Sequence, residues 1–109
     1  MQIKQIKIGA ITYDIIEEKG LTNGDKDVKL DGHIRYSECQ ICVETGMAEQ
    51  AKRQVIWHEV IHGIMTHAGI RKHDDLLVDT LAYGIMDVLQ NNPWLAGEMP
   101  KPSSDNLTE

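Results

Sequence analysis

Residues 47–68 read MAEQAKRQVIWHEVIHGIMTHA, and this stretch decides the fold. Its apolar side chains recur at helical spacing and on more than one face, which predicts a helix that is buried on most of its sides. Thr45 precedes the stretch as the expected N-cap, and Ala68 and Gly69 follow it as the expected end. A buried helix needs other elements packed around it, and the rest of the chain must supply them.

A second helix is expected next, beginning at Asp74 or Asp75. Pro93 should end it, because proline cannot continue the backbone hydrogen-bond ladder. The apolar residues expected on the inner side of this helix are Leu76, Leu77, Val78, Leu81, Ala82, Ile85, Met86 and Leu89.

The first half of the chain alternates between apolar and polar residues with the period of two that is typical of strands. Residues 2–17 predict a β-hairpin that turns at Gly9, and residues 33–44 predict a second hairpin that turns near Ser37. Residues 20–32, between the hairpins, contain two turn signals and predict a loop.

Together these elements predict an α+β fold, in which a small antiparallel β-sheet of two hairpins packs on the first helix and the second helix follows. Residues 1–96 form a single domain in this interpretation. Residues 97–109, with the sequence GEMPKPSSDNLTE, have the composition of a flexible C-terminal tail.

The charge of the 109-residue chain limits its partners, because 17 acidic and 11 basic residues give a formal net charge of −6. This balance argues against nucleic acid or an anionic membrane as a partner. Lys4 and Lys7 interrupt the apolar residues of the N-terminus, which leaves no run long enough for a secretory signal or a membrane span. A cytoplasmic protein is therefore expected, in which Cys39 and Cys42 are free thiols or metal ligands.

Four of the five histidines lie between residues 58 and 73, and two of them form an H-E-x-x-H motif. On a helix His58 and His62 share one face, about 6 Å apart, where two imidazoles can bind one Zn²⁺ at ~2.1 Å. Glu59 then lies beside the metal and can accept a proton from a zinc-bound water. A chance match or a hydrogen-bonded pair of core histidines is the alternative, but the burial of two imidazoles and a carboxylate without partners is costly.

A catalytic zinc also needs a third protein ligand. Asp79 is the expected one, because it shares a face of the second helix with apolar residues, where a lone carboxylate is unfavourable. Asp75, one turn earlier, is the alternative, although an acid at that position also interacts favourably with the helix dipole. His67 and His73 are expected to lie outside the site.

Tyr83, one turn after Asp79, is a further catalytic candidate. Its hydroxyl can point toward the metal and stabilise an oxyanion. A half-buried aromatic residue with no part in catalysis is an equally simple interpretation.

The two cysteines allow a competing zinc site, because Cys39 and Cys42 precede His58 and His62 at the spacing of a two-Cys, two-His site. The negative charge does not suit a DNA-binding finger of this type. In a regular strand Cys42 points away from the helix, and Glu59 would have no role. The favoured interpretation is that both cysteines are ordinary strand or turn residues.

Three segments carry a family resemblance over most of residues 1–95: G-x-I-x-Y at 32–36, W-H-E-V-I-H-G-I at 57–64, and V-D-T-L-A-Y-G-I-M-D-V-L-Q-N-N-P at 78–93. Through them the chain resembles the short zinc metallopeptidase-like proteins of the ImmA/IrrE type, above all the very small members encoded by bacteriophages and integrated elements. The resemblance implies a minimal zincin-like domain with its zinc held by the two motif histidines and Asp79. Similar proteins usually carry Glu at the position of Asp79, so the shorter Asp requires a closer approach of the second helix.

Two hypotheses from different classes follow. In the first, the protein is a zinc-dependent endopeptidase in which Glu59 activates a zinc-bound water for peptide hydrolysis. Its partner is then a protein or peptide substrate, and the resemblance makes repressor proteins candidates. In the second, the protein is a non-enzymatic domain whose zinc site is a structural staple or a binding surface, because metal binding adds to the folding free energy of a small domain.

Overall fold

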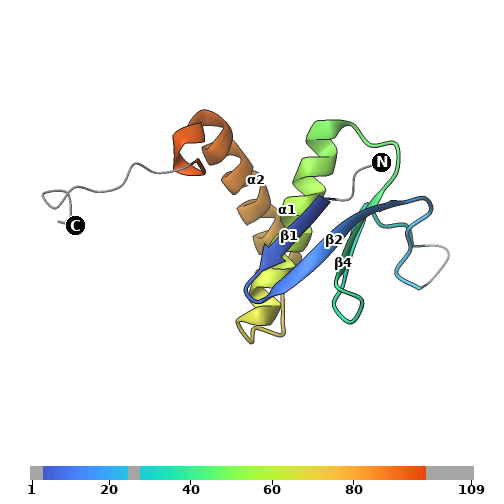
Figure 1. The fold of residues 1–109 in the computed structure, drawn as a ribbon. Helices are drawn as coiled ribbons and strands as arrows, with labels where there is room; N and C mark the ends of the chain where they lie inside the picture. Colours follow the sequence, from blue (N-terminus) through green and yellow to red (C-terminus); the bar gives the residue numbers. More distant parts are fainter. Residues whose placement is uncertain (1–3, 25–27, 98–109) are drawn as a thin grey trace, which may run out of the picture.

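The computed structural model describes residues 4–24 and 28–97, which form an α+β fold with the strands first in the chain and the helices after them (Figure 1). All but the first residue of the predicted C-terminal tail lies outside the described residues. Neither long helix of the described part combines the length and the apolarity that a membrane span requires. The elements are β1 (Lys4–Ile8), β2 (Ile11–Glu18), β3 (Gly32–Arg35), β4 (Gln40–Glu44), α1 (Glu49–His67), α2 (Asp75–Asn91) and a 3₁₀ helix (Pro93–Leu95).

Both predicted hairpins are confirmed. β1 and β2 pair antiparallel and turn at Gly9, whose φ of 60° is readily adopted by glycine. β3 and β4 pair antiparallel across a turn in which the Cys39 amide donates a hydrogen bond to the carbonyl of Tyr36. Each hairpin is therefore a local unit that its own sequence specifies.

The predicted antiparallel sheet is wrong, because the two hairpins join in parallel through β2 and β4. The strand order is β1-β2-β4-β3, so the sheet is mixed. Burial explains this order: β4 carries Ile41, Cys42 and Val43, which have no exposed surface and require neighbours on both sides. β3 is short and partly polar, and it takes the edge, where its outer backbone groups stay unpaired with any strand.

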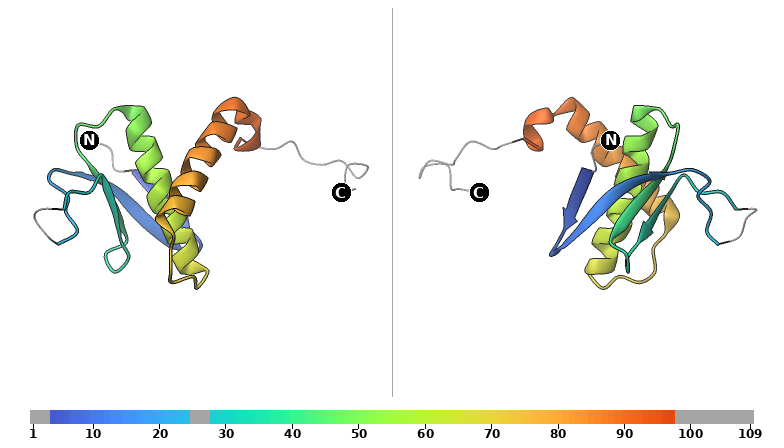
Figure 2. Two further views of the ribbon diagram at one scale, coloured as in Figure 1. Left: turned by 180° about the vertical axis from the view of Figure 1, so that it is seen from behind. Right: turned by 45° about the vertical axis from the view of Figure 1, so that its right-hand side comes forward.

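Helix α1 lies across one face of this sheet (Figure 2). Val60 from the helix belongs to a buried cluster with one residue from each strand, which consists of Ile8, Tyr13, Ile34, Ile41 and Val60. The Tyr13 hydroxyl lies 2.8 Å from Nε2 of His67 and joins the sheet to the last turn of α1. The middle of the helix is thereby fixed to the sheet, which places the H-E-x-x-H segment at the centre of the domain.

The start of α1 differs from the prediction, whereas its end agrees. Thr45 is not the N-cap; its amide donates to the carbonyl of Glu18 and extends the pairing of the sheet. The helix begins at Glu49 after Ala48, because Gly46 with a φ of 81° first turns the chain away from β4. At the other end, Ala68 caps the helix and Gly69 with a φ of 87° stops it.

Helix α2 begins as predicted, because the side chain of Asp74 accepts a hydrogen bond from the Leu76 amide. It packs on α1 through Val78 and Ala82, which lie against Ile61. Its expected inner face is only partly buried, since Leu76, Leu77 and Leu81 are 75%, 48% and 42% exposed. The reason is visible in Figure 2: the two helices meet at one end and diverge, and the sheet lies on the other side of α1.

Candidate metal centre

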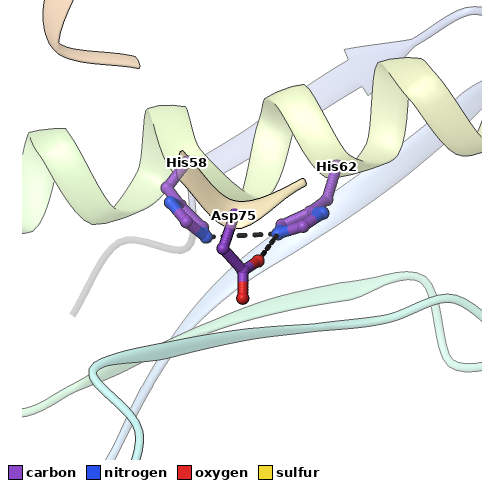
Figure 3. Close-up of side chains that lie close together, drawn as sticks. All are labelled: His58, His62 and Asp75. Carbon is purple, nitrogen blue, oxygen red and sulfur yellow. Dashed lines mark hydrogen bonds and ion pairs between the residues drawn. The ribbon is translucent and has the colours of Figure 1, made fainter. Parts of the chain in front are cut away.

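The two histidines of the motif lie one turn apart near the middle of α1 and face the first turns of α2 (Figure 3). Their Nε2 atoms are 3.1 Å apart, and the two rings meet edge to face with centroids 4.8 Å apart. Two nitrogen ligands of a tetrahedral zinc, each at about 2.05 Å, lie about 3.3 Å apart. The spacing of the two Nε2 atoms therefore suits a shared metal ion.

Asp75 is the acidic residue that faces this pair. Its Oδ1 lies 3.7 Å from Nε2 of His62, and ligand atoms of Asp75, His58 and His62 all lie within 4.8 Å of one another. The carboxylate enters from the first turn of α2 toward the two imidazoles (Figure 3), while its side chain stays 84% exposed. Two nitrogens and one carboxylate oxygen form a donor set that zinc accepts.

Asp79 lies behind His58 rather than between the histidines. Its Oδ1 is 2.7 Å from Nδ1 of His58. A carboxylate can only accept from the ring, so the Nδ1–H of His58 donates and Nε2 is the nitrogen that can face a metal. The apolar surroundings expected for Asp79 are also absent, because its side chain is 50% exposed.

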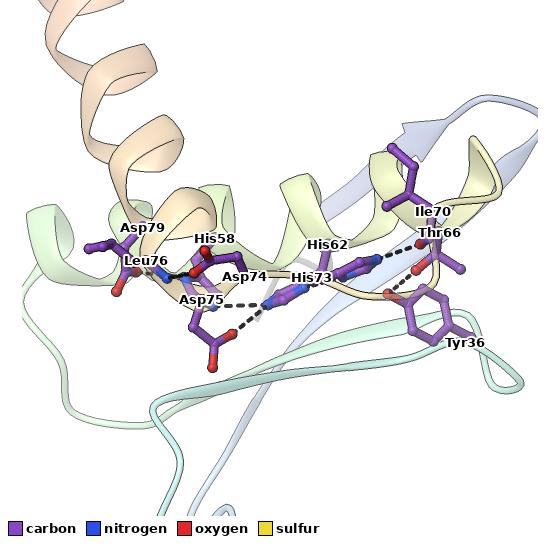
Figure 4. Close-up of polar contacts among 10 residues, drawn as sticks. All are labelled: Tyr36, His58, His62, Thr66, Ile70, His73, Asp74, Asp75, Leu76 and Asp79. Carbon is purple, nitrogen blue, oxygen red and sulfur yellow. Dashed lines mark hydrogen bonds and ion pairs between the residues drawn. The ribbon is translucent and has the colours of Figure 1, made fainter.

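His73 lies at the site, contrary to the sequence prediction. Its Nδ1 is 2.6 Å from Nδ1 of His62, and its Nε2 is 2.7 Å from the carbonyl oxygen of Ile70 (Figure 4). The rings of His62 and His73 stack, with an interplanar angle of 22°. Helical periodicity could not reveal this contact, because His73 belongs to the connection between the helices, which folds back along α1. His67 does lie outside the site, bound to Tyr13.

The electrostatics of the histidine pair also suit a metal. Burial lowers the pKa of His62, and the neighbouring charges of His58 and His73 lower it further. A lowered pKa favours the neutral imidazole, which is the form that binds zinc.

Glu59 is the one buried charged residue of the described core, with 7% of its surface exposed. Burial raises the pKa of its carboxyl to about 7, although the charge of His58 and a hydrogen bond from the Ile34 amide act in the opposite direction. Gly32 makes room for it, because a Cβ at this position would lie 3.3 Å from Oε2 of Glu59 and 2.3 Å from Cγ1 of Val55. The edge strand thus holds a basic carboxylate beside the histidines.

Two adjoining hollows border the site. The first, of about 220 Å³, is lined by Gly32, His58, Glu59 and Asp79 among others. The second, of about 450 Å³, shares wall residues with it and reaches Tyr83. Tyr83 is 61% exposed there, so the structure places it along the wall of a groove, one helical turn beyond Asp79.

The cysteines lie apart from the histidines. Within residues 4–24 and 28–97, the group of potential metal ligands contains neither of them. Cys42 lies fully buried in β4, next to Ile41, which packs toward α1; alternation along the strand therefore directs Cys42 to the opposite face. Burial raises the pKa of its thiol, which disfavours the thiolate that a metal requires.

Comparison with known proteins gives no match for this chain: no family model, no curated protein and no solved structure matches it. Two facing imidazole Nε2 atoms, a nearby carboxylate and a second, buried carboxylate are together suited to metal-assisted hydrolysis.

Proposed function

We propose that the protein is a zinc-dependent peptidase in which His58, His62 and Asp75 hold the metal and Glu59 is the general base. The observation that carries the proposal is the pair of Nε2 atoms 3.1 Å apart, with a buried carboxylate on the next residue of the same helix. Asp75 replaces the expected Asp79 as the third ligand, because its carboxylate faces the Nε2 atoms while that of Asp79 binds the far side of His58.

A zinc ion held by these three residues would supply a Lewis acid for the peptide carbonyl and would lower the pKa of a water molecule. Glu59 then accepts the proton of the attacking water and passes it to the departing amine. Burial suits Glu59 for both steps, because a carboxylate with a raised pKa is a stronger base than an exposed one. The amide of Ile34 donates a hydrogen bond to this carboxylate.

The surroundings of Glu59 favour an extended peptide as the substrate. Edge strand β3 begins beside the smaller hollow, and the backbone groups of an edge can pair with an added strand. The adjoining hollow extends the groove along α2 to Tyr83, which can contact the substrate there. The resemblance to ImmA/IrrE-type proteins supports the same class and makes repressor proteins encoded by phages or mobile elements, in the cytoplasm of a host cell, the first substrates to try.

A Glu59→Gln variant tests this proposal, with Glu49→Gln as the matched control on the exposed first turn of α1. The wild-type protein should bind one zinc ion and cleave candidate repressors or a library of unstructured peptides. Glu59→Gln should keep the zinc and lose cleavage by at least about 100-fold, which is the contribution of a general base. Zinc content is measured by atomic emission and cleavage by mass spectrometry.

Two results would contradict the proposal. If the wild-type protein has no affinity for zinc, the proposed metal centre is wrong. If cleavage survives in Glu59→Gln, or is lost equally in Glu49→Gln, the assignment of Glu59 as the general base is wrong.

A second candidate function is a non-enzymatic zinc-stapled domain. The small volume of the hollow beside Glu59, about 220 Å³, favours it, because little of a substrate fits there. In that case zinc should raise the unfolding temperature of the wild type and of Glu59→Gln alike, and neither protein should cleave any peptide.

A further inference from the structure

We infer that His73 is a positioning residue, which fixes the protonated nitrogen and the orientation of His62 so that Nε2 of His62 faces the metal. This inference rests on the metal site of the proposed function. It concerns a residue outside the H-E-x-x-H motif and outside both helices, in the connection between α1 and α2.

The donors and acceptors of the two hydrogen bonds made by the His73 ring can be assigned from its contact with the Ile70 carbonyl. The carbonyl oxygen of Ile70 has no proton, so the 2.7 Å contact with His73 requires a proton on Nε2 of His73. In a neutral His73 the other nitrogen, Nδ1, is then a bare acceptor. The 2.6 Å contact between the two Nδ1 atoms needs one proton, and His62 has to provide it.

The position of the lone pair of His62 follows from the position of its proton. With its proton on Nδ1, a neutral His62 has a free lone pair on Nε2, and this atom points at Nε2 of His58. His58 is held in the same way by Asp79 on its Nδ1. The two Nε2 atoms face each other at 3.1 Å, so a proton or a metal cation has to lie between them.

His73 is itself held in place on both sides. The amide of Ile70 donates to the carbonyl of Met65 in the last turn of α1. Asp74, the next residue after His73, caps α2. The backbone on both sides of His73 is thereby fixed, the Ile70 carbonyl accepts from its ring, and its stacked geometry limits rotation of the His62 ring.

The two imidazoles are thus supported by different chemistry, His58 by a carboxylate and His62 by a histidine that ends on a backbone carbonyl. Partners of this kind orient metal ligands, and their removal commonly lowers metal affinity 10- to 100-fold. His73 can do this without touching the metal.

The inference is tested with His73→Ala, the conservative variant His73→Asn, and His33→Ala as an exposed histidine control on β3. Zinc affinity is measured by competition with a chromophoric chelator. His73→Ala should bind Zn²⁺ about 10- to 100-fold more weakly than the wild type. His73→Asn should regain most of the affinity, because its amide oxygen can accept the Nδ1–H of His62, and His33→Ala should match the wild type.

A second measurement does not depend on zinc or on the folding of any variant. Nitrogen-15 NMR of the metal-free wild type should show the proton of His62 on Nδ1. A proton on Nε2 of His62 overturns the inference, and so does wild-type zinc affinity in His73→Ala. If the wild type binds no zinc, the proposed function fails, while the NMR result still decides the role of His73.

Discussion

Helices α1 and α2 have 19 and 17 residues, and α2 has the larger share of apolar residues, yet α2 is the less buried of the two. The middle of α1 is covered by the sheet on one side and by α2 on another, so Val60 and Ile61 are both less than 10% exposed. α2 has α1 as its main neighbour, and Leu77 and Leu81 face solvent. Burial in this domain is thus decided by how many neighbours an element has, and the side chains of α1 should carry most of the stability.

The sharpest test of this contrast compares Ile61→Ala in α1 with Leu81→Ala in α2. Ile61 is 4% exposed and its truncation should lower the free energy of unfolding by about 3 kcal/mol, as for other buried aliphatic residues. Leu81 is 42% exposed, and its truncation should cost less than about 1 kcal/mol. Urea denaturation measures both. Equal losses would mean that another molecule covers the outer face of α2 in solution.

The helices also divide the proposed metal site, since α1 supplies the imidazoles and α2 the carboxylates. Asp75→Asn should weaken zinc binding by about 100-fold or more, because it removes a proposed ligand. Asp79→Asn should weaken it by about 10-fold to 100-fold, because it removes only the partner of His58. Chelator competition gives both values. The reverse order would show that Asp79 is the ligand, as the sequence predicts.

Two glycines provide the third and smallest comparison. Gly32→Ala places a methyl group 2.3 Å from Cγ1 of Val55 and should lower the free energy of unfolding by about 1–3 kcal/mol. Gly84→Ala, in α2, meets no atom within 4 Å and should raise that free energy by about 0.5–1 kcal/mol. Thermal and urea unfolding measure whether each substitution lowers or raises the free energy of unfolding. A destabilising Gly84→Ala would contradict the open surface described for α2.

Much of the fold can be predicted from local patterns. The period of two around Gly9 specifies the first hairpin, and Asp74 marks the start of α2 through its own hydrogen bond to the Leu76 amide. The order of the strands cannot be read in this way. Each hairpin specifies its own turn, but the choice of β4 as the partner of β2 depends on burial in the completed sheet.

The candidate site, like the strand order, can be predicted only in part from local sequence patterns. The spacing of His58 and His62 predicts that they share a face, because four residues are about one helical turn. The choice between Asp75 and Asp79 depends on the angle at which α2 meets α1, and both aspartates are on the same face of α2. His73 lies in a connection without any periodicity, so only the path of the chain brings it to His62.

The donors of the proposed metal site all lie between residues 58 and 75, whereas Glu59 depends on Ile34 in the second hairpin. Closing so short a loop costs little chain entropy, and contacts between near neighbours in the sequence form early in folding. The proposed donors are therefore brought together by contacts between residues that are close in the sequence. Glu59 receives its hydrogen bond from Ile34 only where β3 packs on α1, so in the proposed site the metal donors and the base depend on different parts of the fold.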